Sequence, residues 1–152
     1  MGSRDGTARL WDVRRGMELA TMVEHTMIVN SAAFNPDGTQ VATAGWDLTV
    51  RVWDAESGEA PAMLEGHDDL IRSVAFSPNG EQLVTASHDG TARLWDVASR
   101  EELAVLEGHE GWVMSAVFNP DGTKVITTGL DGTVRLWDTG TRTELAILSL
   151  YE

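Results

Sequence analysis

The feature that most constrains this chain is an internal repeat with a period of 42 residues. The dipeptide Trp-Asp and two further residue types keep this spacing without insertion or deletion, which excludes a chance pattern. A fixed period of this length is the signature of repeat architectures, in which each unit buries its apolar surface against its neighbours. The repeated residues are Trp11-Asp12, Trp53-Asp54, Trp95-Asp96 and Trp137-Asp138, with His25, His67 and His109 and with Asp5, Asp47, Asp89 and Asp131.

Each period contains short β-prone runs separated by turn residues, which predicts four antiparallel strands per repeat. A turn with Pro at its second position and Gly at its end closes the first strand. The third strand alternates apolar and polar side chains, and a fourth strand follows a further turn. The expected first strands are Val29–Phe34, Ile71–Phe76 and Val113–Phe118, the second Gln40–Ala44, Gln82–Ser87 and Lys124–Gly129, and the third Thr49–Asp54, Thr91–Asp96 and Thr133–Asp138.

The turn between the second and third strands carries Asp-Gly at Asp89-Gly90 and Asp131-Gly132. Asp-Gly is a strong signal for a tight hairpin, because Gly accepts the positive φ that the turn requires. Leu48 stands where the other repeats have glycine. We therefore expect the turn at Leu48 to differ slightly from the other two.

Gly-His, the hairpin Asp and Trp-Asp in one register resemble the WD40-repeat β-propeller family over essentially the whole chain. The resemblance implies an all-β fold in which four-stranded antiparallel blades are arranged radially. About three and a half blades are expected. They comprise an N-terminal half-blade at 1–25 that holds only third and fourth strands, and blades at 26–67, 68–109 and 110–152.

A histidine, a threonine, an aspartate and a tryptophan recur together in each full period, and the first three invite comparison with a catalytic triad. The resemblance implies instead a buried hydrogen-bonded tetrad that ties the loop before the first strand to the second and third strands. A buried His and Asp need partners, which Thr and Trp can supply. We therefore expect no catalytic residues. The tetrads are His25, Thr43, Asp47 and Trp53; His67, Thr85, Asp89 and Trp95; and His109, Thr127, Asp131 and Trp137.

Composition excludes several other functions. The 24 acidic and 11 basic side chains give a net charge of −13, which disfavours nucleic acid and anionic membranes as partners. No apolar run is long enough for a transmembrane helix, and no signal peptide is recognisable. The absence of cysteine is compatible with a cytoplasmic location, although a cysteine-free chain can occupy any compartment. Histidines in three separate blades cannot converge on one metal ion, so neither a metal nor a cofactor is expected.

A binding surface is expected where the repeats differ, because shared positions serve the scaffold. By resemblance, the loop positions at the top of each blade surround the central channel, where partners usually dock. Trp46 and Trp112 are the two tryptophans outside the Trp-Asp motif, and interblade packing is an equal alternative to binding for both. The candidate top-face residues are Ile28, Asn30, Trp46, Leu70, Arg72, His88, Trp112, Met114 and Leu130.

A chain of about fourteen strands would form half of a seven-bladed ring and leave an apolar blade face bare at each end. If each face carries about 400–500 Å² of apolar surface, its exposure forgoes up to about 10 kcal/mol. We therefore expect self-association, most simply a head-to-tail homodimer with about seven or eight blade positions. Strand swapping, or a trimer with more positions, remains open.

Two functional interpretations follow. The first is a non-enzymatic scaffold for protein or peptide interaction, assembled as a homo-oligomer. The second is a structural fragment, or an engineered half-propeller, that binds no ligand and whose only activity is self-assembly. The diverged top-face residues favour the first, and the incomplete first blade favours the second.

Overall fold

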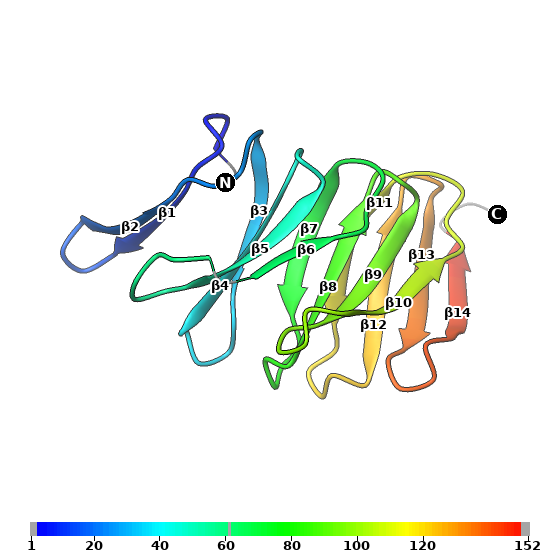
Figure 1. The fold of residues 1–152 in the computed structure, drawn as a ribbon. Helices are drawn as coiled ribbons and strands as arrows, with labels where there is room; N and C mark the ends of the chain where they lie inside the picture. Colours follow the sequence, from blue (N-terminus) through cyan, green and yellow to red (C-terminus); the bar gives the residue numbers. More distant parts are fainter. Residues whose placement is uncertain (1–2, 61, 150–152) are drawn as a thin grey trace.

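The structure, a computed structural model, describes residues 3–60 and 62–149, and all of its regular elements are β-strands. Four antiparallel sheets stand side by side, with the β1–β2 sheet at one end of the stack and the β11–β14 sheet at the other (Figure 1). The described residues contain no helix that could cross a membrane. The all-β class and the four-stranded antiparallel blades predicted from the repeat are therefore confirmed.

The four sheets follow one another along the chain, and each strand is hydrogen-bonded to the next within its sheet. The first sheet has only two strands, and each of the other three has four. The strands are β1 (Ala8–Asp12) and β2 (Met17–Met22); β3 (Val29–Phe34), β4 (Gln40–Gly45), β5 (Thr49–Asp54) and β6 (Ala62–Glu65); β7 (Ile71–Phe76), β8 (Gln82–Ser87), β9 (Thr91–Asp96) and β10 (Glu102–Glu107); and β11 (Val113–Phe118), β12 (Lys124–Gly129), β13 (Thr133–Asp138) and β14 (Glu144–Ser149).

The predicted strand bounds agree with the structure except at β4, which extends one residue further, to Gly45. The ladder register repeats as well, since Val41 lies opposite Trp53 and Leu83 lies opposite Trp95. Such agreement is expected where one face of a strand is buried, because a slip of one residue would turn every side chain to the other face.

The hydrophobic core lies between neighbouring sheets. We call the face of a sheet that meets the preceding sheet its front face, and the face that meets the following sheet its back face. Val50 and Leu64 on the back face of the β3–β6 sheet pack with Ile71, Leu83 and Trp95 on the front face of the β7–β10 sheet. The same arrangement recurs between the β7–β10 and β11–β14 sheets. Each blade therefore obtains its stability from its neighbours.

Hydrogen bonds from backbone N–H groups to serine hydroxyls also join the sheets. The N–H of Val74 donates to Ser31 Oγ at 3.2 Å, and the N–H of Ala116 donates to Ser73 Oγ at 3.1 Å. The two bonds repeat at the 42-residue period, so the spacing between adjacent blades is set by polar as well as apolar contacts.

The turn at Leu48 keeps the left-handed backbone conformation of its glycine counterparts and, as expected, differs from them only slightly. Leu48 has φ +66°, compared with +86° at Gly90 and +76° at Gly132. Arg100 and Arg142 have the same property in another turn, where Gly16 and Gly58 occupy the equivalent positions. The register of the neighbouring strands holds the left-handed conformation even where the side chain disfavours it.

We expect Leu48→Gly to raise the free energy of unfolding by up to about 1 kcal/mol, because a left-handed backbone costs an L-residue about 1–2 kcal/mol and glycine almost nothing. Part of this gain is offset by the flexibility that glycine adds to the unfolded chain. Urea denaturation followed by circular dichroism measures the change. Gly90→Leu is the matched reverse substitution, and a gain in stability from it would contradict the argument.

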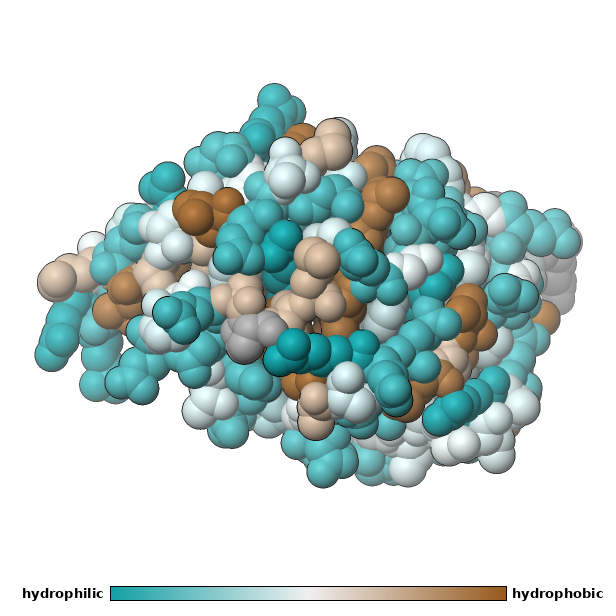
Figure 2. Space-filling model, in the orientation of Figure 1, coloured by the Kyte–Doolittle hydropathy of each residue, from teal (hydrophilic) through white to brown (hydrophobic). Residues whose placement is uncertain are grey.

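The surface view shows a mainly hydrophilic face with hydrophobic side chains gathered in small separate patches (Figure 2). Exposed large apolar side chains nevertheless occur on the sheets at both ends of the stack, including Trp11 at 51% and Leu148 at 64% exposure. Their equivalents in the inner blades are buried, so these two faces differ from the rest of the molecule.

Candidate functional site

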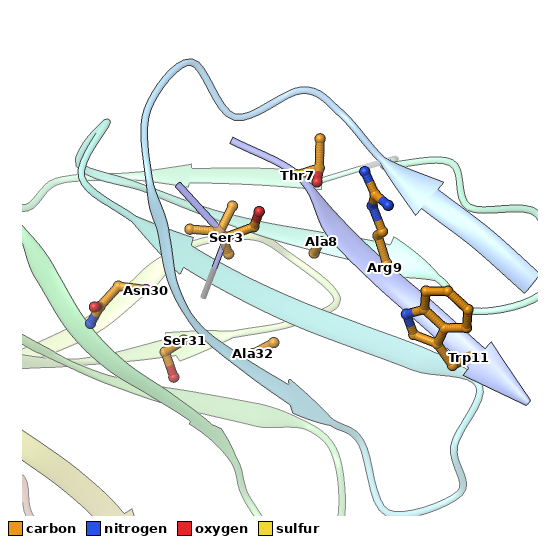
Figure 3. Close-up of a pocket in the computed structure, with 9 residues that line it drawn as sticks. Ser3, Thr7, Ala8, Arg9, Trp11, Asn30, Ser31 and Ala32 are labelled. Carbon is orange, nitrogen blue, oxygen red and sulfur yellow. The ribbon is translucent and has the colours of Figure 1, made fainter. Parts of the chain in front are cut away.

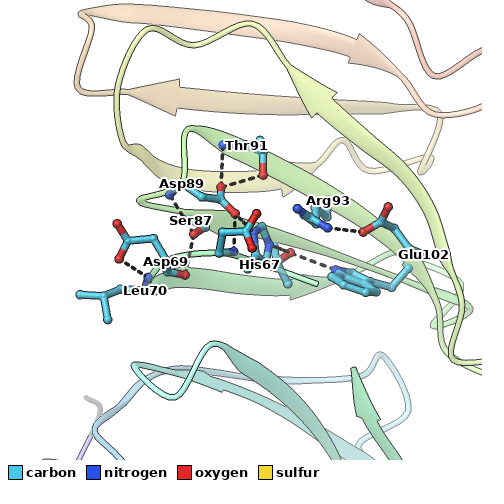
Figure 4. A network of polar contacts seen from close by, with 11 residues as sticks. His67, Asp69, Leu70, Ser87, Asp89, Thr91, Arg93 and Glu102 are labelled. Carbon is cyan, nitrogen blue, oxygen red and sulfur yellow. Dashed lines mark hydrogen bonds and ion pairs between the residues drawn. The ribbon is translucent and has the colours of Figure 1, made fainter. Parts of the chain in front are cut away.

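The structure joins the four members of each tetrad by hydrogen bonds. In the β7–β10 sheet, Trp95 Nε1 donates to Thr85 Oγ1 at 2.9 Å, and Thr85 Oγ1 lies 2.7 Å from His67 Nε2. His67 Nδ1 lies 2.6 Å from the Asp89 carboxylate (Figure 4). A neutral imidazole that carries its proton on Nδ1 satisfies all of these contacts, because the threonine hydroxyl can then donate to Nε2.

The other two tetrads have the same geometry. The His Nε2–Thr Oγ1 distances are 2.7 Å at His25 and 2.8 Å at His109, and the Trp Nε1–Thr Oγ1 distances are 2.7 Å at Trp53 and 2.9 Å at Trp137. All three threonines are completely buried. Three copies of one closed arrangement indicate a repeated structural element.

Each tetrad aspartate also holds the loops on either side of it. Asp89 accepts hydrogen bonds from the N–H of Asp68 at 3.2 Å and from the N–H and hydroxyl of Thr91 at 2.9 and 2.7 Å. The loop before β7 is thereby fixed to the turn between β8 and β9. Asp47 and Asp131 make the corresponding bonds in their own blades.

These contacts shift the acid–base equilibria of the tetrad. Burial alone would raise the pKa of Asp47, but the hydrogen bonds from His25, Thr49 and Thr26 outweigh it, and the pKa falls below 3.8. The pKa values of Asp89 and Asp131 are lowered in the same way. Burial lowers the pKa of His25 below 6.5 in spite of the Asp47 carboxylate. The favoured state is therefore a neutral His25 beside an ionised Asp47.

We expect the free energy of unfolding to fall in two steps on acidification. His25 and His88 have folded-state pKa values lowered from 6.5, so their contribution is complete above pH 6.5 and is lost as the pH falls through the folded-state values. The contribution of Asp47, Asp89 and Asp131 is lost only below about pH 3.8.

Urea denaturation at pH 8, 7, 6 and 5 tests the first step. His88→Gln is the informative variant, because it removes one of the two histidines without touching a tetrad and should flatten the profile. If the free energy of unfolding of the parent chain does not change from pH 8 to pH 5, the first step is ruled out.

A repeated ion pair was not anticipated from the sequence. Arg93 Nη1 lies 2.5 Å from Glu102 Oε2, and Arg135 Nη1 lies 2.6 Å from Glu144 Oε2. An arginine stands two residues before each Trp-Asp, and this periodic signal could have indicated the ion pair. The glycine of Gly-His makes room for the arginine, since a Cβ on Gly66 would lie 2.8 Å from Arg93 Nη1.

In the β3–β6 sheet the arginine of this ion pair binds a glutamate from a different position of the repeat. Ala60 stands where the other blades have Glu102 and Glu144, and Glu24 stands where they have the glycine of Gly-His. Arg51 Nη1 pairs instead with Glu24 Oε2 at 2.6 Å. The carboxylate thus comes from the preceding loop, and the two departures from the repeat compensate each other.

The candidate top-face residues lie in the loops before each first strand, in the first strands themselves and in the turns between the second and third strands. Backbone hydrogen bonds join two of these positions in every blade: Trp46 N to Ile28 O, His88 N to Leu70 O, and Leu130 N to Trp112 O, at 2.8–2.9 Å. Asn30 Nδ2 donates to Arg72 O of the next blade at 2.8 Å. Met114 is half-buried in β11.

The most specific contact on this surface is the stack of His88 on Trp112. Their ring centroids are 3.9 Å apart and their planes differ by 5°, and the two residues belong to adjacent blades. Trp112 nevertheless remains 46% exposed, whereas Trp46 is half-buried. Trp112 thus packs against the adjacent blade and still remains accessible to solvent. Burial and the neighbouring Arg72 lower the pKa of His88, which favours an uncharged ring in the stack.

Three top-face residues carry buried polar atoms without a hydrogen-bond partner in the part of the chain that the structure describes: Trp46 Nε1, Arg72 Nε and His88 Nε2. Buried polar atoms without partners are unusual in folded proteins and are often completed by water or by a bound molecule. Within residues 3–60 and 62–149, no cluster of three or more His, Asp or Glu side chains could hold a metal ion.

Comparison with known proteins gives two findings. The family described as "WD domain, G-beta repeat" (WD40) matches residues 16–54, 58–96 and 100–138. The mouse F-box-like/WD repeat-containing protein TBL1X is 53% identical over 36 residues. That alignment covers 24% of this chain and 7% of the mouse protein, which is less than one 42-residue period of the repeat.

Proposed function

Because the chain belongs to the WD domain, G-beta repeat (WD40) family, whose repeats generally form scaffolds for protein interaction, we propose that it is a non-enzymatic scaffold that closes a propeller ring by self-association. The observation that carries the proposal is the contrast between the tetrads, which repeat in every full blade, and the top face, which does not. The tetrads use the same residues in all three blades, whereas the top-face positions differ in every blade.

The polar groups of the tetrads argue against catalysis. In each blade the threonine hydroxyl is buried between an imidazole and an indole N–H, and the imidazole is held between the threonine and a carboxylate. A nucleophile needs access to substrate, and Thr43, Thr85 and Thr127 have 0% exposure. The tetrads are therefore assigned to stability, and the chain is proposed not to be an enzyme.

The top face offers side chains typical of interface anchors. Aromatic residues and arginine are enriched at the centres of protein interfaces, and here Trp112, His88 and Arg72 lie on two adjacent blades. The asymmetry of the set favours one protein or peptide partner over a ligand repeated in each blade. The net charge of −13 makes nucleic acid and anionic membranes poor candidates.

The exposed back face of the β11–β14 sheet supports the proposed self-association. Leu148 is 64% exposed and Ile126 39%, whereas their counterparts Leu64 and Val84 are 2% and 0% exposed. A second copy supplies the front face of the β1–β2 sheet, where Trp11 is 51% exposed. Head-to-tail contact between two copies would repeat the geometry of the interface between adjacent blades.

Two measurements test the proposal. Light scattering behind size exclusion should give a mass near twice 16.5 kDa over a range of concentrations, and a stable monomer would remove the self-association. For the top face, a peptide is first selected from a library for its binding to the parent chain. The double variant Trp112→Ala with His88→Ala should then no longer capture this peptide. Unchanged capture would favour the second candidate function, a structural unit whose only activity is self-assembly.

A further inference from the structure

We propose that the top face contains a carboxylate-binding site, in which Arg72 with Trp46, His88 and Trp112 binds an acidic side chain of a peptide partner. We call these four residues the carboxylate site. Trp46 follows β4, Arg72 is the second residue of β7, His88 follows β8, and Trp112 precedes β11. The inference rests on the top-face function proposed above and adds the chemistry of the partner.

The first observation is that Arg72 has no counter-ion. Arg51, Arg93 and Arg135 are half-buried like Arg72, and each binds a glutamate oxygen through Nη1 at 2.5–2.6 Å. Among the described residues, no carboxylate oxygen lies within 4 Å of the Arg72 guanidinium. A guanidinium is always charged, and its fork of N–H donors fits a carboxylate. Arg72 therefore favours a ligand that supplies one.

The second observation is that the atoms without partners are donors. Trp46 Nε1 and Arg72 Nε are buried and unpartnered within residues 3–60 and 62–149. Indole and guanidinium N–H groups can only donate, so both atoms lack an acceptor. Arg51 Nε and Arg93 Nε are also unpartnered, but their guanidinium groups already bind glutamate. A negatively charged acceptor would satisfy the donors and the charge of the carboxylate site together.

The third observation is that these side chains adjoin one another across the blades. Trp46 and His88 hold the same position of the repeat, 42 residues apart. His88 stacks on Trp112 of the following blade at 3.9 Å. Trp46 stands in the same relation to the blade of Arg72, and β4 packs against β7. The charge of Arg72 in turn lowers the pKa of His88. The four residues therefore follow one another across two interfaces between blades.

The recess between β1 and β3 offers a contrast (Figure 3). It has a volume of about 600 Å³ and is lined in part by Arg9. Arg9 already lies 3.6 Å from the Asp5 carboxylate and 3.7 Å from that of Glu18. Its charge is therefore neutralised within the chain, and a larger space does not by itself provide a site for an anion.

Trp112 supplies apolar contact surface beside the carboxylate site's charge. His88 lies parallel to the Trp112 ring, and Trp112 is nevertheless 46% exposed. An accessible indole ring of this kind packs well against another aromatic side chain. The best partner is therefore a peptide in which an acidic residue has an aromatic neighbour.

The charge around the site favours a carboxylate over a phosphate. Asp69 lies near enough to His88 to raise its pKa in part, and Asp68 and Glu110 are exposed in the loops before β7 and β11. A carboxylate carries one negative charge, which the single guanidinium of Arg72 balances. A phosphate carries nearly two at pH 7, and the second would be repelled by the neighbouring acids.

The test uses the peptide Gly-Phe-Glu-Phe-Gly with acetyl and amide ends, so that glutamate is its only carboxylate. In a titration followed by nuclear magnetic resonance, the Trp46 indole N–H signal should shift progressively and saturate. The signals of Trp53, Trp95 and Trp137 should stay in place, because their indole N–H groups are bound to threonine. Trp46→Phe assigns the signal by removing it.

Two analogues of the peptide test the chemistry. Glutamine in place of glutamate should weaken binding at least about tenfold, because the charge-assisted hydrogen bonds are lost. Phosphoserine should bind no more tightly than glutamate. Equal binding of glutamate and glutamine peptides would overturn the carboxylate site but leave top-face peptide binding intact. Tighter binding of phosphoserine, or no saturable binding at millimolar concentration, would also overturn it, and the library selection tests the top face separately.

Variants of the chain locate the site. Arg72→Met should weaken binding of the glutamate peptide at least about tenfold, whereas Arg14→Met, which removes the same charge from the exposed turn after β1, should leave it unchanged. Asp69→Asn removes a repelling carboxylate and should strengthen binding about twofold, a result that does not depend on how well Arg72→Met folds. Unchanged affinity in Arg72→Met, or weaker binding by Asp69→Asn, would overturn the proposal.

Discussion

Replacing Trp95 by alanine is expected to lower the free energy of unfolding by about 3–5 kcal/mol, the range for removal of a buried aromatic side chain. Trp95 is 2% exposed and packs between the β3–β6 and β7–β10 sheets. Its loss also removes the indole N–H from Thr85, whose hydroxyl is buried. Urea denaturation followed by far-ultraviolet circular dichroism measures the change.

The repeat supplies a matched control in Trp11, which stands at the same position of its own repeat. Trp11 is half-exposed, so Trp11→Ala should change the free energy of unfolding by less than about 1 kcal/mol. The two variants delete the same atoms from equivalent positions, and their difference isolates burial and the tetrad. Equal losses would mean that Trp11 is covered in solution or that the tetrad adds little.

The tetrads and strands could be predicted because their physics is local and is repeated. A buried imidazole or carboxylate requires partners, and residues that keep one register in every repeat are the ones that can supply them. His67, Thr85, Asp89 and Trp95 lie in the proposed order with hydrogen bonds of 2.6–2.9 Å. Strand bounds followed from turn residues at fixed spacing, which is why nearly all of them agree with the structure.

Features that depend on the surroundings of a residue could not be predicted from its type. Leu48 suggested a slightly different turn, but its residue type gave no sign that pairing of β4 with β5 on either side of it would keep the left-handed conformation of glycine. The contact of Arg51 with Glu24 depends on two departures from the repeat in different strands and loops. The stack of His88 on Trp112 joins two blades and depends on their distance. In each case a neighbouring element decides the outcome.

Exposure of the outer faces was expected from the number of strands and not from residue type. Leu148 belongs to the same apolar pattern as Leu64 and Leu106, so its position within the repeat does not distinguish it from these two residues. The structure shows 64% exposure for Leu148, against 2% and 1% for the other two. A single apolar side chain on a surface needs no explanation. Exposure of a whole face that is buried in every inner blade suggests a partner.

Leu148→Glu is therefore expected to convert the proposed dimer into a monomer, with a dissociation constant at least about 100-fold higher. Burying a carboxylate against an apolar face without a partner costs several kcal/mol, which is more than such an increase requires. Light scattering and sedimentation over a concentration series measure the effect. Circular dichroism should show an unchanged fold, because Leu148 is exposed within one chain.

Ile147→Glu is the matched control. Ile147 is the preceding residue of β14, is 50% exposed and points to the opposite face of the sheet. The same charge is introduced into the same strand, so effects on net charge or on the stability of β14 should appear in both variants. A dimer that withstands Ile147→Glu and fails with Leu148→Glu uses the back face of the β11–β14 sheet. If both variants dissociate, or neither does, the two copies meet elsewhere and head-to-tail closure of the ring is wrong.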